Sequence, residues 1–469
     1  MNYKYLLISL LLVLFDRNIL FSQNLNDWNT IIGSAFLENK SYNLLEKICD
    51  EAGGRIIGSP QNEKALKILS DELIKLGYNP VYEKFKTKGW VRGDDQIIVK
   101  TPVLKKLKAV ALGYVNTTPT FESEIVYAGY GYDEDYQNID AKNKIVLVTR
   151  ETPSGKDALF SSELIKIAAG KGAKAILFIS EKSGTLVIAR TGNFQGDATE
   201  IPAFNLSYEE GKWLQRLYEK KIITTIEITT KSYCKEVETA NLVASLPGKV
   251  SDAIVVGAHI DSWDLGQGGI DNGQGTAILY DIARVFKKYF PDNYYTINFV
   301  WLNGEELGLL GAKKYVEMHK NDKIIAMINM DMTGIPEGFN CMGFDEFIPF
   351  LNNLVKKLNG FDLKQGVQSS PWTNSDHEPF MLAGIPTFTV MAHLDEDMYK
   401  YYHEMGDSFD KVNKKYISEA VAVIGVLLKE LANNTVIKFQ IKSEKEMIDI
   451  LTNSHIDKTL KRQKEWIYK

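Results

Sequence analysis

Short apolar runs alternate with longer amphipathic segments between residue 239 and about residue 434. The apolar runs predict strands at Ile254–Val256, Thr296–Leu302, Ile324–Met330 and Thr387–Met391. The amphipathic segments predict helices at Gly273–Tyr289, Gly311–Lys320 and Lys415–Leu431. Strands that alternate with helices favour a mostly parallel sheet covered by helices on both faces. We therefore predict an α/β fold for this region.

The first half of the chain has two further patterns. Ser59-Pro60 is a typical helix start, and the apolar face that follows it ends at Gly77. Residues 109–235 predict a smaller α/β module, with short strands at 144–148, 173–179 and 201–206 and a helix at 162–169. This module contains no histidine and no acidic cluster at a strand end. We interpret it as an insertion without chemistry of its own.

These patterns divide the chain into five parts. We expect a signal peptide at residues 1–22, the start of the main domain at 23–108, the insertion at 109–235, the rest of the main domain at 236–435 and a charged tail at 436–469. The charge of the tail indicates an exposed helix or partial disorder.

The amino terminus has the features of an export signal. Lys4 precedes an apolar stretch from Tyr5 to Phe15, which is too short to span a bilayer. A buried amino-terminal helix is the alternative. Export predicts a secreted or periplasmic protein, and no later segment is long and apolar enough to serve as a membrane anchor.

Composition narrows the functional classes. The chain has 469 residues, a net charge of −5 and no long basic run, so it lacks the electrostatic signature of a nucleic-acid-binding protein. Its three cysteines are too few for a disulfide framework, and we expect buried thiols with at most one bridge.

Candidate metal ligands follow the predicted strands. They are His259, Asp261, Asp271, Glu305, Glu306, Asp331 and His403. Paired carboxylates directly after a buried strand require a compensating cation. Side chains at the carboxyl ends of strands converge on one crevice of an open α/β sheet. Histidine and carboxylate ligands without thiolates suit zinc.

These residue types suggest how two zinc ions would act. Asp271 is the candidate for a carboxylate that bridges both ions. Only one of Glu305 and Glu306 need be a ligand, and the other can take a proton from a zinc-bound water, whose pKa falls to about 7. Asp261 is placed to accept the second ring N–H of His259 and to orient that ligand.

The segment from His259 to Gly268, followed by Asp271-Asn272-Gly273, resembles the co-catalytic dizinc exopeptidases of the aminopeptidase and glutamate carboxypeptidase superfamily. Gly58-Ser59-Pro60, residues 90–93, residues 372–377 and residues 394–407 support the same resemblance. The insertion resembles a protease-associated domain. The tail after residue 434 has no counterpart in the family.

The resemblance implies a role for each matching position. His259, Asp271 and Asp331 would hold one zinc ion, and Asp271, Glu306 and His403 would hold the second. Glu305 would be the general base and acid, and a cis peptide would join Asp271 to Asn272. The implied substrates are dipeptides or short peptides with free ends, and the implied assembly is a homodimer.

Residues that would bind the substrate are harder to identify. His377, with Ser375 and Asp376, is a candidate for binding substrate or stabilising an oxyanion. An equally good interpretation is that His377 satisfies a hydrogen bond in the core.

Two other functions fit part of the pattern. A glutaminyl cyclase, which is a zinc aminoacyltransferase, would use a similar fold with one zinc ion and would not need His259 as a ligand. A receptor-like binding module would have kept the fold and lost ligands. The complete ligand set favours the exopeptidase, although neither the direction of cleavage nor the side-chain preference follows from the sequence.

Overall fold

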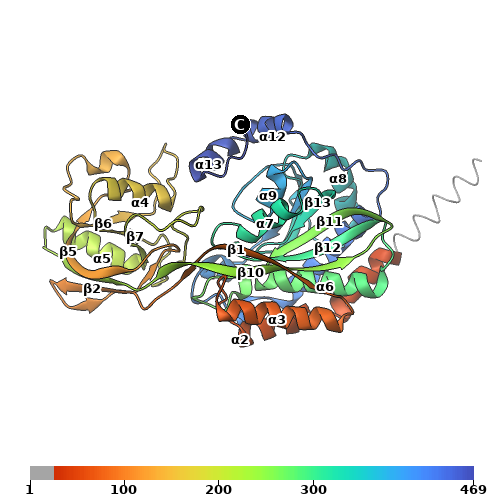
Figure 1. Ribbon diagram of the computed structural model, residues 1–469, viewed down its shortest axis with the longest axis horizontal. Coiled ribbons are helices and arrows are strands. Elements are labelled where there is room, and N and C mark those ends of the chain that lie inside the picture. Colours follow the sequence, from red (N-terminus) through yellow and green to blue (C-terminus); the bar gives the residue numbers. More distant parts are fainter. Residues whose placement is uncertain (1–25) are drawn as a thin grey trace, which may run out of the picture.

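The computed structural model describes residues 26–469, so the predicted signal peptide at residues 1–22 lies outside the described residues. Two lobes lie side by side, and each is built on one sheet (Figure 1). In spatial order, the strands of the larger lobe are β1 (Val81–Val91), β10 (Tyr233–Leu246), β12 (Tyr295–Leu302), β11 (Val250–His259), β13 (Ile324–Asn329), β16 (Thr387–His393), β14 (Ile335–Asn340) and β15 (Gly366–Gln368).

The centre of this sheet is parallel. β11 pairs in parallel with both β12 and β13, and β13 pairs in parallel with β16. Antiparallel pairs join β10 to β12 and β14 to β16. The predicted fold class, a mostly parallel sheet between layers of helices, is confirmed.

Helices cover both faces of the large sheet (Figure 1). One layer contains α2 (Ser41–Glu51), α3 (Pro60–Lys75), α6 (Gln274–Tyr289) and α11 (Lys414–Ala432). The other contains α7 (Leu310–Met318) and α9 (His377–Leu382), and α8 (Ile348–Lys357) packs beside β15. Successive side chains of a strand point to opposite faces, so Ile254 and Val256 join the first core and Val255 joins the second.

The predicted start of α3 is confirmed. Ser59 accepts a hydrogen bond from the backbone N–H of Asn62 at 3.1 Å, and Pro60 occupies the first helical position. A cap of this kind satisfies one of the free N–H groups at a helix start.

The smaller lobe is the insertion. In spatial order, its strands are β3 (Lys105–Lys106), β2 (Gln96–Thr101), β9 (Thr225–Thr230), β5 (Thr118–Tyr127), β6 (Ile145–Thr149), β7 (Ala175–Ile179), β8 (Ala203–Leu206) and β4 (Ala109–Ala111). Its helices are α4 (Ser161–Gly170) and α5 (Tyr208–Glu219). The sheet takes in residues from Gln96, upstream of residue 109. The chain enters the lobe through β1 and leaves through β10, and these two strands pair along their length from Val81↔Val243 to Val91↔Tyr233.

The charged tail is helical, as one of the two alternatives predicted, but it is docked on the larger lobe and not simply exposed. It forms α12 (Glu444–Asn453) and α13 (Ile456–Gln463). Met447, Leu451 and Leu460 are fully buried and belong to the core of the larger lobe. Charged residues dominate the tail, but these few apolar positions recur at helical spacing and are enough to dock it.

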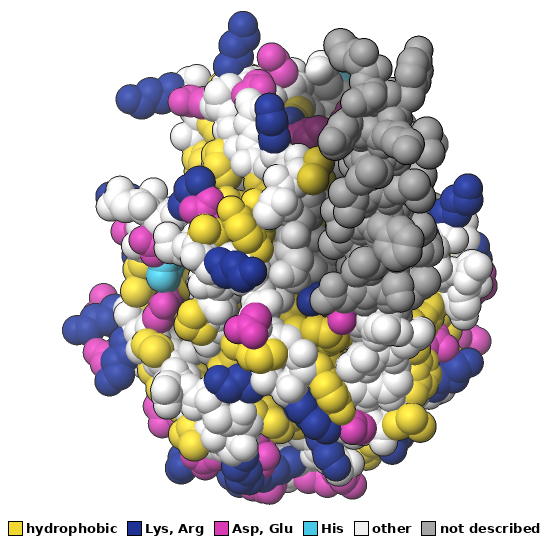
Figure 2. Space-filling view, turned by 90° about the vertical axis from the view of Figure 1, so that its right-hand side faces the viewer, with side chains coloured by type: hydrophobic (Ala, Val, Ile, Leu, Met, Phe, Trp, Pro, Cys, Tyr) yellow, Lys and Arg dark blue, Asp and Glu magenta, His cyan; other side chains and the backbone are white. Residues whose placement is uncertain are grey.

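The described surface is mixed in character, and all three cysteines are free thiols. On the face of the larger lobe away from the insertion, acidic and basic side chains are mixed with apolar ones (Figure 2). Across residues 26–469, every helix is too short or too polar to cross a bilayer. Cys49 and Cys341 are buried free thiols, and Cys234 is a partly buried one.

Candidate metal centre

The predicted ligands lie at the carboxyl ends of three neighbouring parallel strands. His259 is the last residue of β11, Glu305 and Glu306 follow β12, and Asp331 follows β13. Because these strands are adjacent, their ends meet at one edge of the sheet. His403 reaches the same place from the turn after α10 (Glu396–Tyr401).

Two sets of three ligand atoms form around Asp271. His259, Asp271 and Asp331 make one set, and Asp271, Glu306 and His403 make the other, with the atoms of each set within 4.8 Å of one another. Nε2 of His259 lies 3.2 Å from Oδ1 of Asp271. Nε2 of His403 lies 3.0 Å from Oδ2 of Asp271 and 3.1 Å from Oε2 of Glu306. Asp271 therefore offers one oxygen to each set, as a bridging carboxylate does.

The backbone at Asp271 is unusual in the way that the family resemblance implied. The peptide bond between Asp271 and Asn272 is cis. The side chain of Asn272 donates to the carbonyl of Met330 at 2.8 Å and accepts from the N–H of Gly275 at 3.1 Å. These contacts tie the Asp271 turn to the end of β13 and to the start of α6.

The donors fit divalent zinc. Nε2 of His259 is buried and makes no hydrogen bond of good geometry within residues 26–469, but it faces carboxylate oxygens of Asp271 and Asp331 at 3.2 and 3.4 Å. Burial lowers the pKa of His403, but the charge of Glu306 and hydrogen bonds to Asp271 and Glu306 outweigh it and raise that pKa to about 9. Burial raises the pKa of Glu306 to about 7. Such a concentration of buried carboxylates is stable only with cations nearby, and two zinc ions would supply them.

The role expected for the Asp261 side chain needs a correction. Nδ1 of His259 lies 3.1 Å from the backbone carbonyl of Asp261 and 3.6 Å from its Oδ1. The carboxylate instead accepts the backbone N–H groups of Gly304, Glu305 and Glu306 at 2.8, 3.1 and 3.3 Å. Asp261 thus orients His259 through its main chain, while its side chain fixes the turn that carries the paired glutamates.

His403 is held by the insertion. Its Nδ1 lies 3.1 Å from the carbonyl oxygen of Ala189, and its own carbonyl accepts the N–H of Ala189 at 2.8 Å. The ring of Tyr402 stacks on that of His403 at 3.7 Å. Because the other ring nitrogen is engaged by a carbonyl, Nε2 is the one that faces the ligand set.

Sequence reasoning missed the roles of three residues that position ligands. Asp407 accepts the backbone N–H groups of Ile270 and Asp271 at 2.6 and 3.1 Å. Ser375 donates to Oδ2 of Asp331 at 2.6 Å. Asp407 and Ser375 lie in segments that carried the family resemblance, which was the available signal.

The third missed residue is Arg55, whose guanidinium is fully buried. It donates to the carbonyls of Ile260, Gln267 and Gly268 at 2.6, 2.7 and 2.9 Å. Gly268 has a φ of 60°, and a side chain there would collide with Ser262. Arg55 therefore holds the glycine-rich turn between His259 and Asp271 in a shape that only glycine adopts easily.

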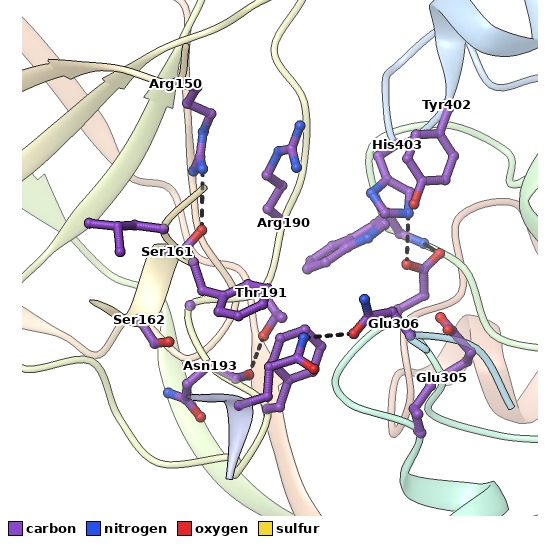
Figure 3. Close-up of a pocket in the computed structure, with 18 residues that line it drawn as sticks. Arg150, Ser161, Ser162, Arg190, Thr191, Asn193, Glu305, Glu306, Tyr402 and His403 are labelled. Carbon is purple, nitrogen blue, oxygen red and sulfur yellow. Dashed lines mark hydrogen bonds and ion pairs between the residues drawn. The ribbon is translucent and has the colours of Figure 1, made fainter. Parts of the chain in front are cut away.

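Glu305 stands apart from both ligand sets and lines a cavity of about 300 Å³. Burial raises the pKa of Glu305 well above its ordinary value, and Asp331 and Glu306 add to the effect. In Figure 3, Glu305, Glu306 and His403 lie on one side of this cavity.

The opposite side of the cavity belongs to the insertion (Figure 3). Arg150, Ser161 and Ser162 line it together with residues 190–194. This corrects the interpretation of the insertion as a module without chemistry of its own. Burial lowers the pKa of Arg150 to about 9, and the neighbouring Arg190 adds to the effect.

All three predicted substrate residues are buried, and none of them lines the cavity. His377 is fully buried, its Nε2 lies 2.9 Å from the carbonyl of Trp372, and burial lowers its pKa to about 4. Asp376 is buried, and neither carboxylate oxygen has a hydrogen-bond partner in the described chain. Neither residue, nor Ser375, lines the cavity.

Comparisons with known proteins agree with this geometry. Residues 241–428 match Peptidase family M28, and residues 110–214 match the PA domain. Carboxypeptidase Q of Mus musculus is 27% identical over 84% of this chain and 86% of its own length. Aminopeptidase YwaD of Bacillus subtilis is 26% identical over 87% of this chain and 89% of its own.

Solved structures show the same fold. The Peptidase M28 precursor from Shewanella amazonensis has a TM-score of 0.77 and 24% identity, over 90% of this chain and 99% of that one. BSAP, a zinc aminopeptidase from Bacillus subtilis, has a TM-score of 0.69 and 23% identity, over 86% and 96% of the two chains. The predicted resemblance to zinc exopeptidases of the aminopeptidase and glutamate carboxypeptidase superfamily, and with it the assignment to an enzyme, is confirmed. The chain therefore carries a Peptidase family M28 domain at residues 241–428 and a PA domain at residues 110–214.

Proposed function

We propose that this chain is a dizinc exopeptidase that hydrolyses dipeptides and short peptides. The observation that carries the proposal is the position of Asp271, whose two oxygens face His259 and His403 in two complete ligand sets. Asp331 completes the first set, and Glu306 completes the second.

Bound zinc would polarise the scissile carbonyl and lower the pKa of an attacking water to about 7. Glu305 is the group on the chain that takes the proton from that water. Glu305 belongs to neither ligand set and lines the cavity. Burial also raises the pKa of its carboxyl group. The same carboxyl then returns the proton to the leaving amine, which completes the hydrolysis.

The cavity supports small substrates. Its volume of about 300 Å³ is at the lower end of ligand sites. Arg150 and Arg190 give the insertion side a positive charge, offset in part by Glu181, which pairs with Arg190. Arginine is well suited to bind carboxylates. Arg150 and Arg190 therefore favour peptides whose free carboxylate lies on the insertion side of the cavity, opposite the candidate zinc ligands.

One peptide panel tests the proposal. Dipeptides and tripeptides with free termini, acetylated amino termini and amidated carboxyl termini are incubated with the zinc-loaded chain, with and without a chelator. We expect hydrolysis of short free peptides that the chelator abolishes and zinc restores. Chelator-insensitive hydrolysis, or none on any peptide, would contradict the proposal.

Zinc content separates this function from that of a glutaminyl cyclase. Two zinc ions per chain favour the exopeptidase, whereas one ion would favour the cyclase. The two ligand sets that share Asp271 support the first result.

We extend the proposal to export and assembly. Residues 1–22 have the pattern of a signal peptide, and the family resemblance implies a homodimer. Fractionation of cells that express the full chain would test export, and light scattering of the purified enzyme would test the dimer.

A further inference from the structure

We propose that Gln463, in the carboxyl-terminal helix α13, is a substrate-binding residue whose side-chain oxygen accepts a hydrogen bond from an N–H group of the peptide. This inference rests on the proposed peptidase function. It assigns to the tail a role that the family resemblance does not supply.

Gln463 is buried but has an unused acceptor. Its side chain is 3% exposed, and it lines the cavity that also contains Glu305 and Glu306. Its Nε2 donates to Oδ1 of Asn374, another lining residue, at 2.7 Å. Its Oε1 has no hydrogen-bond partner in residues 26–469. A buried amide oxygen without a partner is costly, and a donor on a bound ligand would satisfy it.

The insertion holds α13 from one side. Arg462 makes a two-pronged ion pair with Glu163 of α4, with Nε to Oε1 at 3.0 Å and Nη2 to Oε2 at 2.6 Å. The guanidinium of Arg462 also lies 4.8 Å from the ring of Phe160, which lines the cavity. Gln195 of the insertion donates to the backbone carbonyl of Gln463. Paired arginine–carboxylate contacts of this type fix geometry well.

The larger lobe holds the tail from the other side. Glu465 pairs with Lys313 of α7 at 2.8 Å, and Leu460 is fully buried in the core. Contacts on both sides hold the backbone at Gln463, and the hydrogen bond to Asn374 orients its side chain. Its free oxygen is therefore preorganised, and an acceptor held in this way loses little entropy when a ligand binds.

The chemistry of the acceptor defines its partner. An uncharged amide oxygen accepts from N–H groups, and a short peptide offers two kinds, a terminal ammonium and a backbone amide. The arginines on the insertion side would bind a carboxylate, so the two ends of a peptide would meet different groups. Gln463 would thus help to select peptides with a donor at a defined distance from the scissile bond.

Replacement of the amide tests the contact directly. Gln463→Met keeps the length of the side chain and removes both its acceptor and the Nε2 donor to Asn374. We measure kcat and KM for a dipeptide with a free amino terminus and for its analogue in which hydrogen replaces the amino group. Lys458→Met, at an exposed position of the same helix, is the matched control. Zinc content and thermal unfolding must match those of the wild type.

We expect Gln463→Met to lower kcat/KM by roughly 10-fold on the free dipeptide, the effect of losing one hydrogen bond to a charged or polar group. If the des-amino analogue shows no loss, the terminal ammonium is the donor. An equal loss on both substrates identifies the backbone amide. Unchanged kcat/KM on both substrates, in a folded and zinc-loaded variant, would overturn the inference.

A second variant covers the case in which Gln463→Met does not fold. Arg462→Gln removes the ion pair with Glu163 that holds α13, and it replaces no residue that lines the cavity. We expect Arg462→Gln to raise KM more than it lowers kcat. Arg462→Lys, which keeps the positive charge, should have a KM between those of Arg462→Gln and the wild type. KM equal to that of the wild type would again overturn the inference. A wild-type enzyme inactive on every peptide would instead refute the proposed function.

Discussion

Asp407 holds the main chain of Asp271, the residue shared by the two ligand sets. Oδ2 of Asp407 accepts the N–H of Asp271 at 3.1 Å, and Oδ1 accepts the N–H of Ile270 at 2.6 Å. Burial raises the pKa of Asp407 to about 7. A carboxylate is rarely buried against main-chain N–H groups without a structural reason, and here it fixes the turn that presents both oxygens of Asp271.

We therefore expect Asp407→Ala to weaken zinc binding by roughly 10- to 100-fold, as for other residues that orient metal ligands. Competition with a chromogenic chelator measures this affinity. Asp410→Ala is the matched control, because Asp410 lies nearby in sequence and pairs with the surface residue Lys411. Equal zinc affinity in Asp407→Ala and wild type would contradict the role of this residue.

Glu305→Gln tests the proposed base. The amide cannot accept a proton from water, so we expect kcat to fall by roughly 10²- to 10⁴-fold. Zinc content should not change, because Glu305 belongs to neither ligand set. Steady-state kinetics and metal analysis give the two readouts, with the surface variant Glu317→Gln as control. Wild-type turnover in Glu305→Gln would remove Glu305 from the mechanism.

Arg190→Gln tests the positive wall of the cavity. The loss of one cation should raise KM by roughly 10-fold for a dipeptide with a free carboxylate. It should change KM little for the same dipeptide with an amidated carboxyl terminus. Arg216→Gln, at an exposed position of α5, serves as control. Equal effects on the acid and the amide would show that Arg190 does not bind the substrate carboxylate.

His319 predicts a pH-dependent contribution to stability. Hydrogen bonds to Glu83 and Asp322 raise its pKa from 6.5 to about 9, although burial opposes the change. The charged form stabilises the fold fully below pH 6.5, and this stabilisation disappears as the pH rises through about 9. We expect His319→Gln to lower the free energy of unfolding by about 1 kcal/mol at pH 6. Denaturant unfolding at pH 6 and pH 10 measures the effect, and a difference independent of pH would exclude the ion pairs as its cause.

The sequence located all three strands that precede the candidate ligands, although the predicted Ile254–Val256 covers only the centre of β11 (Val250–His259). The apolar run at Thr296–Leu302 became β12, and the run at Ile324–Met330 became β13, each with one shifted boundary. Buried parallel strands are short and continuously apolar, so they stand out from the polar residues that follow them. The convergence of their ends on one edge then brought His259, Glu306 and Asp331 together.

Contacts between lobes could not be predicted in this way. The pairing of His403 with Ala189, and that of Arg462 with Glu163, joins residues that no local pattern relates. Charged residues are so frequent in the tail that its few buried apolar side chains did not form a recognisable pattern in the sequence. The carboxylate of Asp261 was assigned to His259 because the two are close in sequence, but the nearer donors are N–H groups of a turn that follows another strand.

The two hydrogen bonds between Ala189 and His403 have a thermodynamic consequence. They join His403, a proposed zinc ligand, to the main chain of the PA domain at Ala189, so the position of this lobe and the affinity for the proposed second zinc ion would be thermodynamically coupled. Linkage is reciprocal: if a bound peptide draws the lobe inward and tightens zinc by some factor, zinc must tighten that peptide by the same factor. At low zinc concentration, the enzyme would then bind peptides more weakly and also turn them over more slowly.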